Sequence, residues 1–296
     1  MVAGLPEKVQ AALERLLAQA GAGRVRSLRP VSGGDISQAY HVVAEGGEFF
    51  LKYREGAPPG FFAAEARGLR LLAEAGAVRV PRVWGWEEDP ALLLLEWLPP
   101  PPRGADRDRA AAALGAGLAR LHRVRGPAFG LGEDGFIGAL PQPGGWFPDW
   151  PSCWRHRLAT QAEHAARRGH LAGERARRLE RLLGRLEEWL GEDPGGPALL
   201  HGDLWGGNWM VGPAGEPVLI DPAAFYGSRE VDLAMTELFG GFPPAFYATY
   251  QAEYPLPPGY EERRPLYQLY YLLVHLALFG EGYGPGVDRI LRRYAG

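Results

Sequence analysis

The sequence predicts an α+β protein of two lobes, a small, mainly β N-terminal lobe with a helix and a larger, mainly helical C-terminal lobe. β-like runs dominate the first hundred residues, whereas apolar residues at helical spacing dominate the remainder. Between the two parts stands "PPPP", residues 99–102, and four successive prolines cannot lie inside a helix or a sheet. We therefore expect the lobes to cover residues 1–98 and 99–296.

The N-terminal lobe is predicted to contain a helix, three strands, a second helix and two further strands, in that order. In the first helical segment Val9, Leu13 and Leu16 share one face. A Gly-Gly turn separates two of the strands, and Gly76 ends the second helix. The expected elements cover residues 6–20, 24–31, 38–45, 48–53, 61–76, 81–88 and 91–98.

The C-terminal lobe is predicted to be helical, with two short β-like segments that flank the turn "GPAG". Asp106 fits the N-cap of its first helix. A Pro- and Gly-rich stretch, residues 126–151, is expected to be a long loop with Trp146, Phe147 and Trp150 near its end, and a structureless loop of this length is often functional. The helices are expected at residues 106–123, 152–168, 173–190, 230–239 and 262–280, and the β-like segments at 208–212 and 217–221.

Charge excludes a general nucleic-acid binder. The formal net charge of -3 and the pI near 6.2 give no broad attraction to phosphate backbones or anionic membranes. The Arg-rich run 167–185 alternates with glutamates at helical spacing, which is typical of a solvated helix face. We therefore expect no nucleic-acid partner.

The cysteine content and the apolar runs point to the cytoplasm. The single cysteine, Cys153, excludes an intramolecular disulfide and a cysteine zinc cluster. No N-terminal apolar segment resembles a signal peptide, and the longest apolar run, residues 91–98, is far shorter than the roughly 20 residues of a membrane helix. These observations predict a cytoplasmic protein without a membrane partner.

Asp203, Asn208 and Asp221 form the first candidate site. Asn208 is the only asparagine of the chain, and it follows Asp203 by five residues. Phosphoryl transfer needs a carboxylate that accepts the proton of the acceptor hydroxyl, and oxygen ligands that hold a magnesium ion on the phosphates. The three residues supply both. Taken singly, each could also be an ordinary turn residue, so the prediction depends on the three together.

Lys52 and Glu65 form the second candidate site. Only Lys8 and Lys52 are lysines in this arginine-rich chain, which makes a retained lysine informative. Glu65 lies 13 residues after Lys52 in the next predicted helix, where it can hold the ammonium near the α- and β-phosphates of a nucleotide. Upstream, Gly33 and Gly34 would let the backbone approach phosphates closely, although hairpins use Gly-Gly as well.

Glu96, Trp97 and Leu98 are candidates for the adenine site. An adenine ring needs an apolar slot with backbone donors and acceptors at its edge. The apolar strand that ends in these residues runs out into the connection between the lobes and provides such an edge. The same strand is also expected in the core, and the two roles do not compete.

Together these pieces resemble the protein-kinase-like fold as small-molecule kinases use it. Their sequence motifs are similar to those of the fructosamine kinase (ketosamine-3-kinase) family. "HGD" alone is shared with aminoglycoside and choline kinases, whereas "HGDLW" followed by a small residue, Gly and Asn is much more specific. The similar segments, in an order that matches the family along the whole chain, are "SGGDISQAY", "LLLLEWLPP", "HGDLWGGNWM" and "DPAAFYGSREVDLAM".

The resemblance implies ATP-dependent phosphorylation of the 3-hydroxyl of a ketosamine, which is a sugar attached to an amine. In effect this is the first step in removing sugar adducts from protein lysines or free amines, and Mg²⁺ is the implied metal. The implied roles are Asp203 as catalytic base, Asn208 and Asp221 as magnesium ligands, Lys52 and Glu65 as the pair that holds the phosphates, Glu96, Trp97 and Leu98 as the adenine edge, Asp232 as a buried carboxylate that braces the catalytic loop, and Trp205 and Tyr226 as part of the sugar pocket.

Two alternative functions stay open at this point. One is another kinase of the same fold that acts on an aminoglycoside, choline or a similar alcohol, and the other is a non-catalytic nucleotide-binding module. The sequence departs from the family's motifs at Ser37, Gly206 and Ser228, and these departures leave the preferred sugar open. The Gly-loop cysteine that some family members carry is absent, which favours a monomer over a disulfide-linked dimer.

Overall fold

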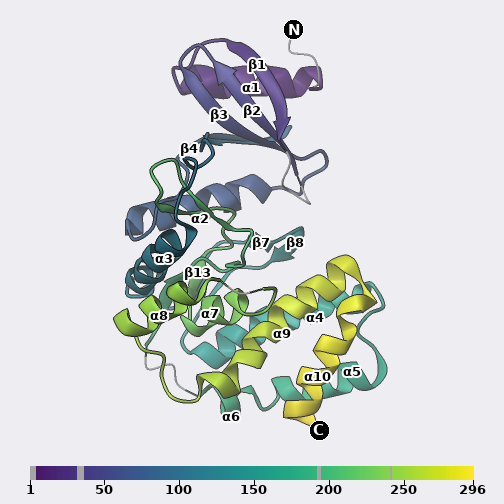
Figure 1. The fold of residues 1–296 in the computed structure, drawn as a ribbon. Coiled ribbons are helices and arrows are strands. Elements are labelled where there is room, and N and C mark those ends of the chain that lie inside the picture. The colour runs from purple at the N-terminus through teal and green to yellow at the C-terminus, as the bar shows by residue number, and fades with distance from the viewer. Residues whose placement is uncertain (1–4, 32–36, 192–194, 241) are drawn as a thin grey trace.

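The computed structural model describes residues 5–31, 37–191, 195–240 and 242–296, and a mainly β N-terminal part lies above a mainly helical C-terminal part in Figure 1. The predicted α+β organisation is confirmed. The division of the lobes between residues 98 and 99 stays a prediction. Gly33 and Gly34 lie outside the described residues.

The N-terminal part is built on one antiparallel sheet with the strand order β1-β2-β3-β5-β4. Successive side chains of β5 point to opposite faces of the sheet. Leu92 and Leu94 therefore pack with α1, whereas Leu93 and Leu95 pack with α2. The elements are α1 (Glu7–Gln19), β1 (Val25–Val31), β2 (Gln38–Ala44), β3 (Gly47–Tyr53), α2 (Phe61–Ala75), β4 (Val83–Glu88) and β5 (Ala91–Glu96).

The C-terminal part has a core between α4 and α9, which lie side by side in Figure 1. Trp150 and Trp154 of α4 contact the rings of Tyr267 and Tyr270 of α9. None of the helices within the described ranges combines the length and the apolar character that crossing a bilayer requires. The helices are α3 (Arg107–Leu121), α4 (Trp150–Arg167), α5 (Gly173–Leu183), α6 (Leu186–Leu190), α7 (Glu230–Thr236), α8 (Pro244–Glu253), α9 (Tyr260–Phe279), the 3₁₀ turn η1 (Glu281–Tyr283) and α10 (Gly284–Ala295).

Short strands connect these helices and carry the loops of the site. They form a sheet of order β10-β13-β6-β9 and two hairpins, β11-β12 and β7-β8. The strands are β6 (Phe129–Leu131), β7 (Gly135–Ile137), β8 (Leu140–Gln142), β9 (Gly145–Phe147), β10 (Ala198–Leu200), β11 (Trp209–Val211), β12 (Pro217–Leu219) and β13 (Phe225–Gly227).

Three sequence predictions about the C-terminal part are wrong. The expected loop over residues 126–151 contains β6 to β9, and each strand has only three residues, too few for a periodic pattern. The expected helix over 173–190 is two helices, α5 and α6, because the chain leaves the helix at Gly184 and Arg185. Helices α8 and α10 were not expected, since Pro and Gly at their starts indicate loops.

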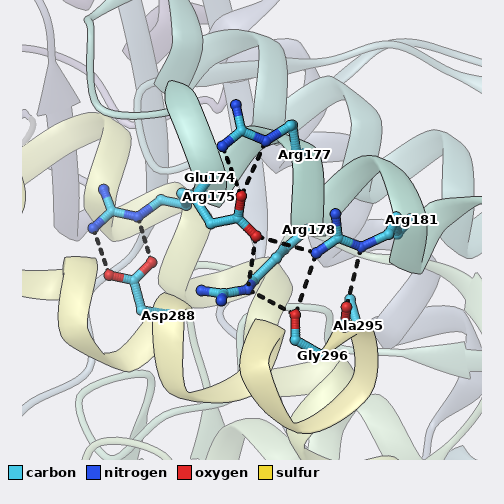
Figure 2. Close-up of polar contacts among 8 residues, drawn as sticks. All are labelled: Glu174, Arg175, Arg177, Arg178, Arg181, Asp288, Ala295 and Gly296. Carbon is cyan, nitrogen blue, oxygen red and sulfur yellow. Dashed lines mark hydrogen bonds and ion pairs between the residues drawn. The ribbon is translucent and has the colours of Figure 1, made fainter.

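The Arg-rich run attaches the last helix instead of only facing solvent. Arg175 of α5 forms a bidentate pair with Asp288 of α10, with N–O distances of 2.7 and 2.9 Å (Figure 2). Arg178 and Arg181 donate to carbonyl groups at the end of α10, and both also contact Glu174 (Figure 2). The predicted solvated face therefore describes only the outer members of the run.

Candidate active site

A cavity of about 730 Å³ lies between the N-terminal sheet and the C-terminal part. From the N-terminal side its lining includes Lys52 of β3 and Glu65 of α2. From the C-terminal side it includes Asp203, Asn208 and Asp221. The chain thus brings five of the predicted site residues to one cavity, although up to 169 positions separate them in sequence.

Lys52 connects the two parts of the molecule. Its Nζ donates to Glu65 Oε1 and to Asp221 Oδ1, each at 2.7 Å, and its side chain is only 12% exposed. Burial alone would lower the pKa of Lys52, but the charges of Asp221 and Glu65 outweigh it and raise the pKa above its ordinary value. The lysine is therefore a fixed positive charge at the centre of the cavity.

The loop that follows β10 is held by a buried carboxylate. Asp232 of α7 accepts hydrogen bonds from the backbone N–H groups of His201 and Gly202 at 2.8 and 2.9 Å. Gly202 has φ +82°, and a Cβ there would lie 2.1 Å from the carbonyl oxygen of Ala223, so only glycine fits. The predicted bracing by Asp232 is confirmed, and the loop enters the cavity with a fixed backbone.

Asp203 is placed by Asn208. The Asn208 side chain donates through Nδ2 to the Asp203 carbonyl oxygen at 2.8 Å and to Asp203 Oδ2 at 3.2 Å. Burial, together with the charge of Asp221, raises the pKa of Asp203 to about 7, and the hydrogen bond from Asn208 offsets part of the rise. A carboxyl group with a pKa near neutrality is suited to accept a proton at neutral pH.

Asp221 has a strained backbone conformation. Its φ of 54° makes it the one residue other than glycine with a positive φ within the described residues. It lies two residues after the end of β12, and the backbone N–H of Ile220, between them, donates to the Asn208 carbonyl oxygen at 3.0 Å. Such strain persists where the surrounding structure imposes it, often at functional sites. Here it directs the Asp221 carboxylate toward Lys52.

Glu96, Trp97 and Leu98 line the cavity at the point where β5 ends. The Glu96 carboxylate accepts from Arg79 at 2.6 Å, and the Trp97 ring stacks on His41 with 3.9 Å between ring centroids. These side chains are therefore held by protein contacts. The Glu96 backbone N–H donates to the Arg82 carbonyl oxygen at 2.8 Å, and the assignment of residues 96–98 to an adenine ring stays a prediction.

The two predicted sugar-pocket residues differ in their placement. Trp205 lines the cavity and is 40% exposed, and its ring lies so close to Gly207 that a Cβ there would be 2.4 Å away. Tyr226 is not among the lining residues, and its contact with the sugar stays a prediction. Its ring packs against Gly126 and Trp146, whereas Phe225, its neighbour on β13, lines the cavity. Alternate residues of a strand face opposite sides, which explains why Phe225 and Tyr226 have different surroundings.

Residues that the sequence did not single out form the rest of the cavity wall. The hairpin β7-β8 reaches from the C-terminal part to α2, where Phe136 contacts Phe61 with ring centroids 5.1 Å apart. Glu133 forms an ion pair with Arg67 at 2.9 Å. Arg157 of α4 also lines the cavity. No sequence signal could mark it, because it is one arginine among many in an ordinary helical pattern.

The fructosamine kinase family model matches residues 8–295. The chain belongs to the fructosamine kinase family. A protein of Lactiplantibacillus plantarum named "Probable ketoamine kinase" is 44% identical to this fructosamine kinase over 282 residues, which are 94% of this chain and 98% of that protein. A protein of Thermus thermophilus with the same kind of name is 42% identical over 274 residues, which are 90% of this chain and 94% of that protein.

Solved structures agree with this membership. A crystal structure from Thermobifida fusca, named as a candidate fructosamine-3-kinase, has a TM-score of 0.84 at 35% identity and covers 96% of this chain and 99% of that one. A choline kinase from Streptococcus pneumoniae has a TM-score of 0.63 at 14% identity over 97% of this chain and 99% of that one, a likeness that shows the fold alone. The chain is thus an ATP-dependent phosphotransferase of kinase-like fold that acts on a hydroxyl group.

Proposed function

We propose that this fructosamine kinase transfers the γ-phosphoryl group of ATP to the 3-hydroxyl of a ketosamine, as the first step in removing sugar adducts from amines. The observation that carries the proposal is the convergence of Lys52, Glu65 and Asp221 with Asp203 and Asn208 on one cavity. The similarity to proteins named as ketoamine kinases supports the class of acceptor.

The nucleotide occupies the N-terminal side of the cavity. The backbone of residues 96–98 offers hydrogen-bonding groups to the adenine edge. Lys52, fixed between two carboxylates, neutralises charge on the α- and β-phosphates. Gly33 and Gly34 are proposed to cover the phosphates with backbone N–H groups.

Asn208 and Asp221 fit a magnesium ion. Both carry the oxygen atoms that Mg²⁺ prefers, and every hydrogen bond of the Asn208 side chain within the described ranges uses Nδ2, which leaves Oδ1 for a metal. No cluster of three His, Cys, Asp or Glu side chains occurs in the part of the chain that is described. This suits an ion that takes its other ligands from phosphate and water. When bound, the ion neutralises charge on the transferring group.

Asp203 is the proposed catalytic base. The 3-oxygen of the sugar forms a bond to the γ-phosphorus, the bond from that phosphorus to the ADP oxygen breaks, and the hydroxyl proton moves to the Asp203 carboxylate. The protein contributes mainly by positioning these groups and by its fixed charges. Trp205, at the rim of the cavity, is proposed to contact the sugar.

We also propose that the protein acts as a monomer. Its one cysteine, Cys153, is buried in α4, and burial raises the pKa of the thiol to about 12. A thiol with such a pKa is almost fully protonated at neutral pH and reacts poorly. A disulfide between two copies of the chain is therefore not expected.

An acceptor screen tests the proposed function. ATP-dependent transfer is measured with fructosamine-, ribulosamine- and erythrulosamine-type acceptors, and with an aminoglycoside and choline for comparison. We expect transfer to the ketosamines, with the phosphate on the 3-oxygen by ³¹P and ¹H NMR of the product. Transfer to the aminoglycoside or choline alone would replace the proposal by another kinase activity. No transfer to any acceptor would indicate a non-catalytic nucleotide-binding module.

A further inference from the structure

Arg157 is a buried cation that has no carboxylate partner among the described residues. The residue is 7% exposed, and its one hydrogen bond within the described residues runs from Nη2 to the hydroxyl oxygen of Tyr270 at 3.3 Å. The Nε–H group is buried and has no acceptor. Because buried charges are normally paired, and buried donors normally bonded, a guanidinium in this condition needs an explanation.

Protein contacts hold Arg157 in place without neutralising it. The guanidinium carbon lies 3.6 Å from the centroid of the Phe225 ring and 5.2 Å from that of Tyr270. The Tyr270 hydroxyl in turn donates to Gln142 Oε1 at 3.1 Å, which fixes the tyrosine. A stacked guanidinium presents its edge, and here the N–H groups of Nη1 and one N–H of Nη2 have no acceptor among the described residues, so they can bind two oxygen atoms of one planar or tetrahedral anion.

Arg157 lies in the same cavity as the proposed base. Arg157, Gln142, Phe225 and Asp203 all line it. Burial raises the pKa of Tyr270, and the charges of Arg157 and Asp203 act on that pKa in opposite directions. Arg157 shares the cavity with the proposed base and takes no part in the Lys52 ion pairs that serve the nucleotide, so we assign it to the acceptor side.

We propose that Arg157 binds an anionic group of the acceptor, so that the preferred ketosamines carry a carboxylate or a phosphate. This inference rests on the proposed function and names its substrate class. A neutral hydroxyl could accept the free hydrogen bonds but would leave the buried charge uncompensated. A carboxylate belongs to an adduct of a free amino acid, and a phosphate to an adduct of a phosphorylated sugar.

Three acceptors that share one sugar type test this proposal. They are the ketosamine of glycine, which carries a carboxylate, the ketosamine of glycinamide, which is its neutral counterpart, and the glycinamide ketosamine of the corresponding terminally phosphorylated sugar. We expect kcat/KM of at least one acidic acceptor to exceed that of the neutral one by about tenfold to a hundredfold. The acidic acceptor that is preferred identifies the source of the anion.

Arg157→Gln should abolish this preference. The substitution should raise KM for the acidic acceptor with little change in kcat, and it should leave the neutral acceptor nearly unaffected, because the lost contact binds ground state and transition state alike. Arg157→Lys keeps the charge but not the planar fork, and it should retain part of the preference. Arg155→Gln is the matched control, since Arg155 lies on the same helix but pairs with Glu187 outside the cavity lining.

The outcomes distinguish failure of the Arg157 proposal from failure of the proposed function. Equal kcat/KM for neutral and acidic acceptors in the unaltered enzyme would overturn the role of Arg157 and leave the proposed function intact. An equal loss on both kinds of acceptor in Arg157→Gln would show that the residue is structural, and it would also overturn the role. If circular dichroism shows that this variant does not fold, the acceptor preferences of Arg157→Lys and of the unaltered enzyme decide whether Arg157 has the proposed role. No turnover of any of the three would overturn the proposed function together with this inference.

Discussion

The two ends of the active-site cavity differ in whether a buried cation is paired with carboxylates. At the nucleotide end Lys52 is paired with both Glu65 and Asp221. At the acceptor end Arg157 is equally buried but has no carboxylate among the described residues. The comparison teaches that the nucleotide end is organised before any ligand binds, whereas the acceptor end leaves a charge for the ligand to satisfy.

The largest effect is expected from Asp203, which stands between the two ends. Asp203→Asn removes the proton acceptor but keeps the shape of the side chain, so kcat should fall roughly 10²- to 10⁴-fold while ATP affinity stays nearly unchanged. Single-turnover kinetics and nucleotide titration measure the two quantities. Asp108→Asn, on an exposed position of α3, is the control. A variant that keeps near-normal turnover would remove Asp203 from the role of base.

The nucleotide end should show its internal pairing in stability as well as activity. Lys52→Met leaves Glu65, which is 15% exposed, without its partner and should lower the free energy of unfolding by about 3 kcal/mol. Activity should fall about a hundredfold, because the positive charge that neutralises the phosphates is lost. Both are measured on the same preparation, by urea unfolding and by steady-state assay.

A double variant separates these two losses. Lys52→Met combined with Glu65→Leu removes the unpaired carboxylate and should recover most of the stability, since a buried ion pair contributes little net stability compared with apolar residues. It should recover none of the activity. If the double variant is as unstable as Lys52→Met alone, the pairing with Glu65 is not what the single substitution disrupts.

The buried support of the catalytic loop predicts a pH dependence of stability. Burial lowers the pKa values of His122 and His201, so below the ordinary histidine range, near pH 6.5, the unfolded chain binds protons that the folded chain does not. Burial would raise the pKa of Asp232, but its hydrogen bonds with His122 and with the Gly202 backbone outweigh burial and lower the pKa, which adds to the loss of stability below the ordinary aspartate range. Both changes make the free energy of unfolding fall as the pH falls.

We expect a loss of about 1 to 3 kcal/mol between pH 7 and pH 5, measured by urea unfolding of the ligand-free protein. His122→Gln should flatten this slope, because one of the two buried histidines no longer titrates. His164→Gln, which alters a histidine on α4 that contacts only a backbone carbonyl, should leave the slope unchanged. An unchanged slope in His122→Gln would contradict the assignment.

The same contrast explains what could be predicted from sequence. Lys52 and Asn208 were found because each is rare in a chain rich in arginine, and because phosphoryl transfer uses a positive charge on the phosphates and oxygen ligands for the metal ion. The long helices and the sheet strands have periodic apolar patterns and were predicted within a few residues. The residues of the nucleotide end can therefore be identified from rare residue types and periodic patterns in the sequence.

The acceptor end lacks such signals. Its strands β6 to β9 have three residues each, so neither their existence nor the direction of their side chains follows from a periodic pattern. Tyr226 was assigned to the sugar pocket from the family resemblance alone, because a three-residue strand has no pattern that says which face is inward. Arg157 is chemically ordinary in sequence, and only its burial without a partner distinguishes it.

The smallest effect is expected at the rim of the acceptor end. Trp205 is 40% exposed and its ring rests on Gly207, so Trp205→Phe shortens a wall of the cavity without removing a charge or a hydrogen bond. KM for the ketosamine should rise a few-fold, about 1 kcal/mol at most, while KM for ATP and the melting temperature stay unchanged. Trp189→Phe, 37% exposed on α6, is the matched control. A change in KM for ATP instead would place Trp205 at the nucleotide end and break the division of the cavity into two ends.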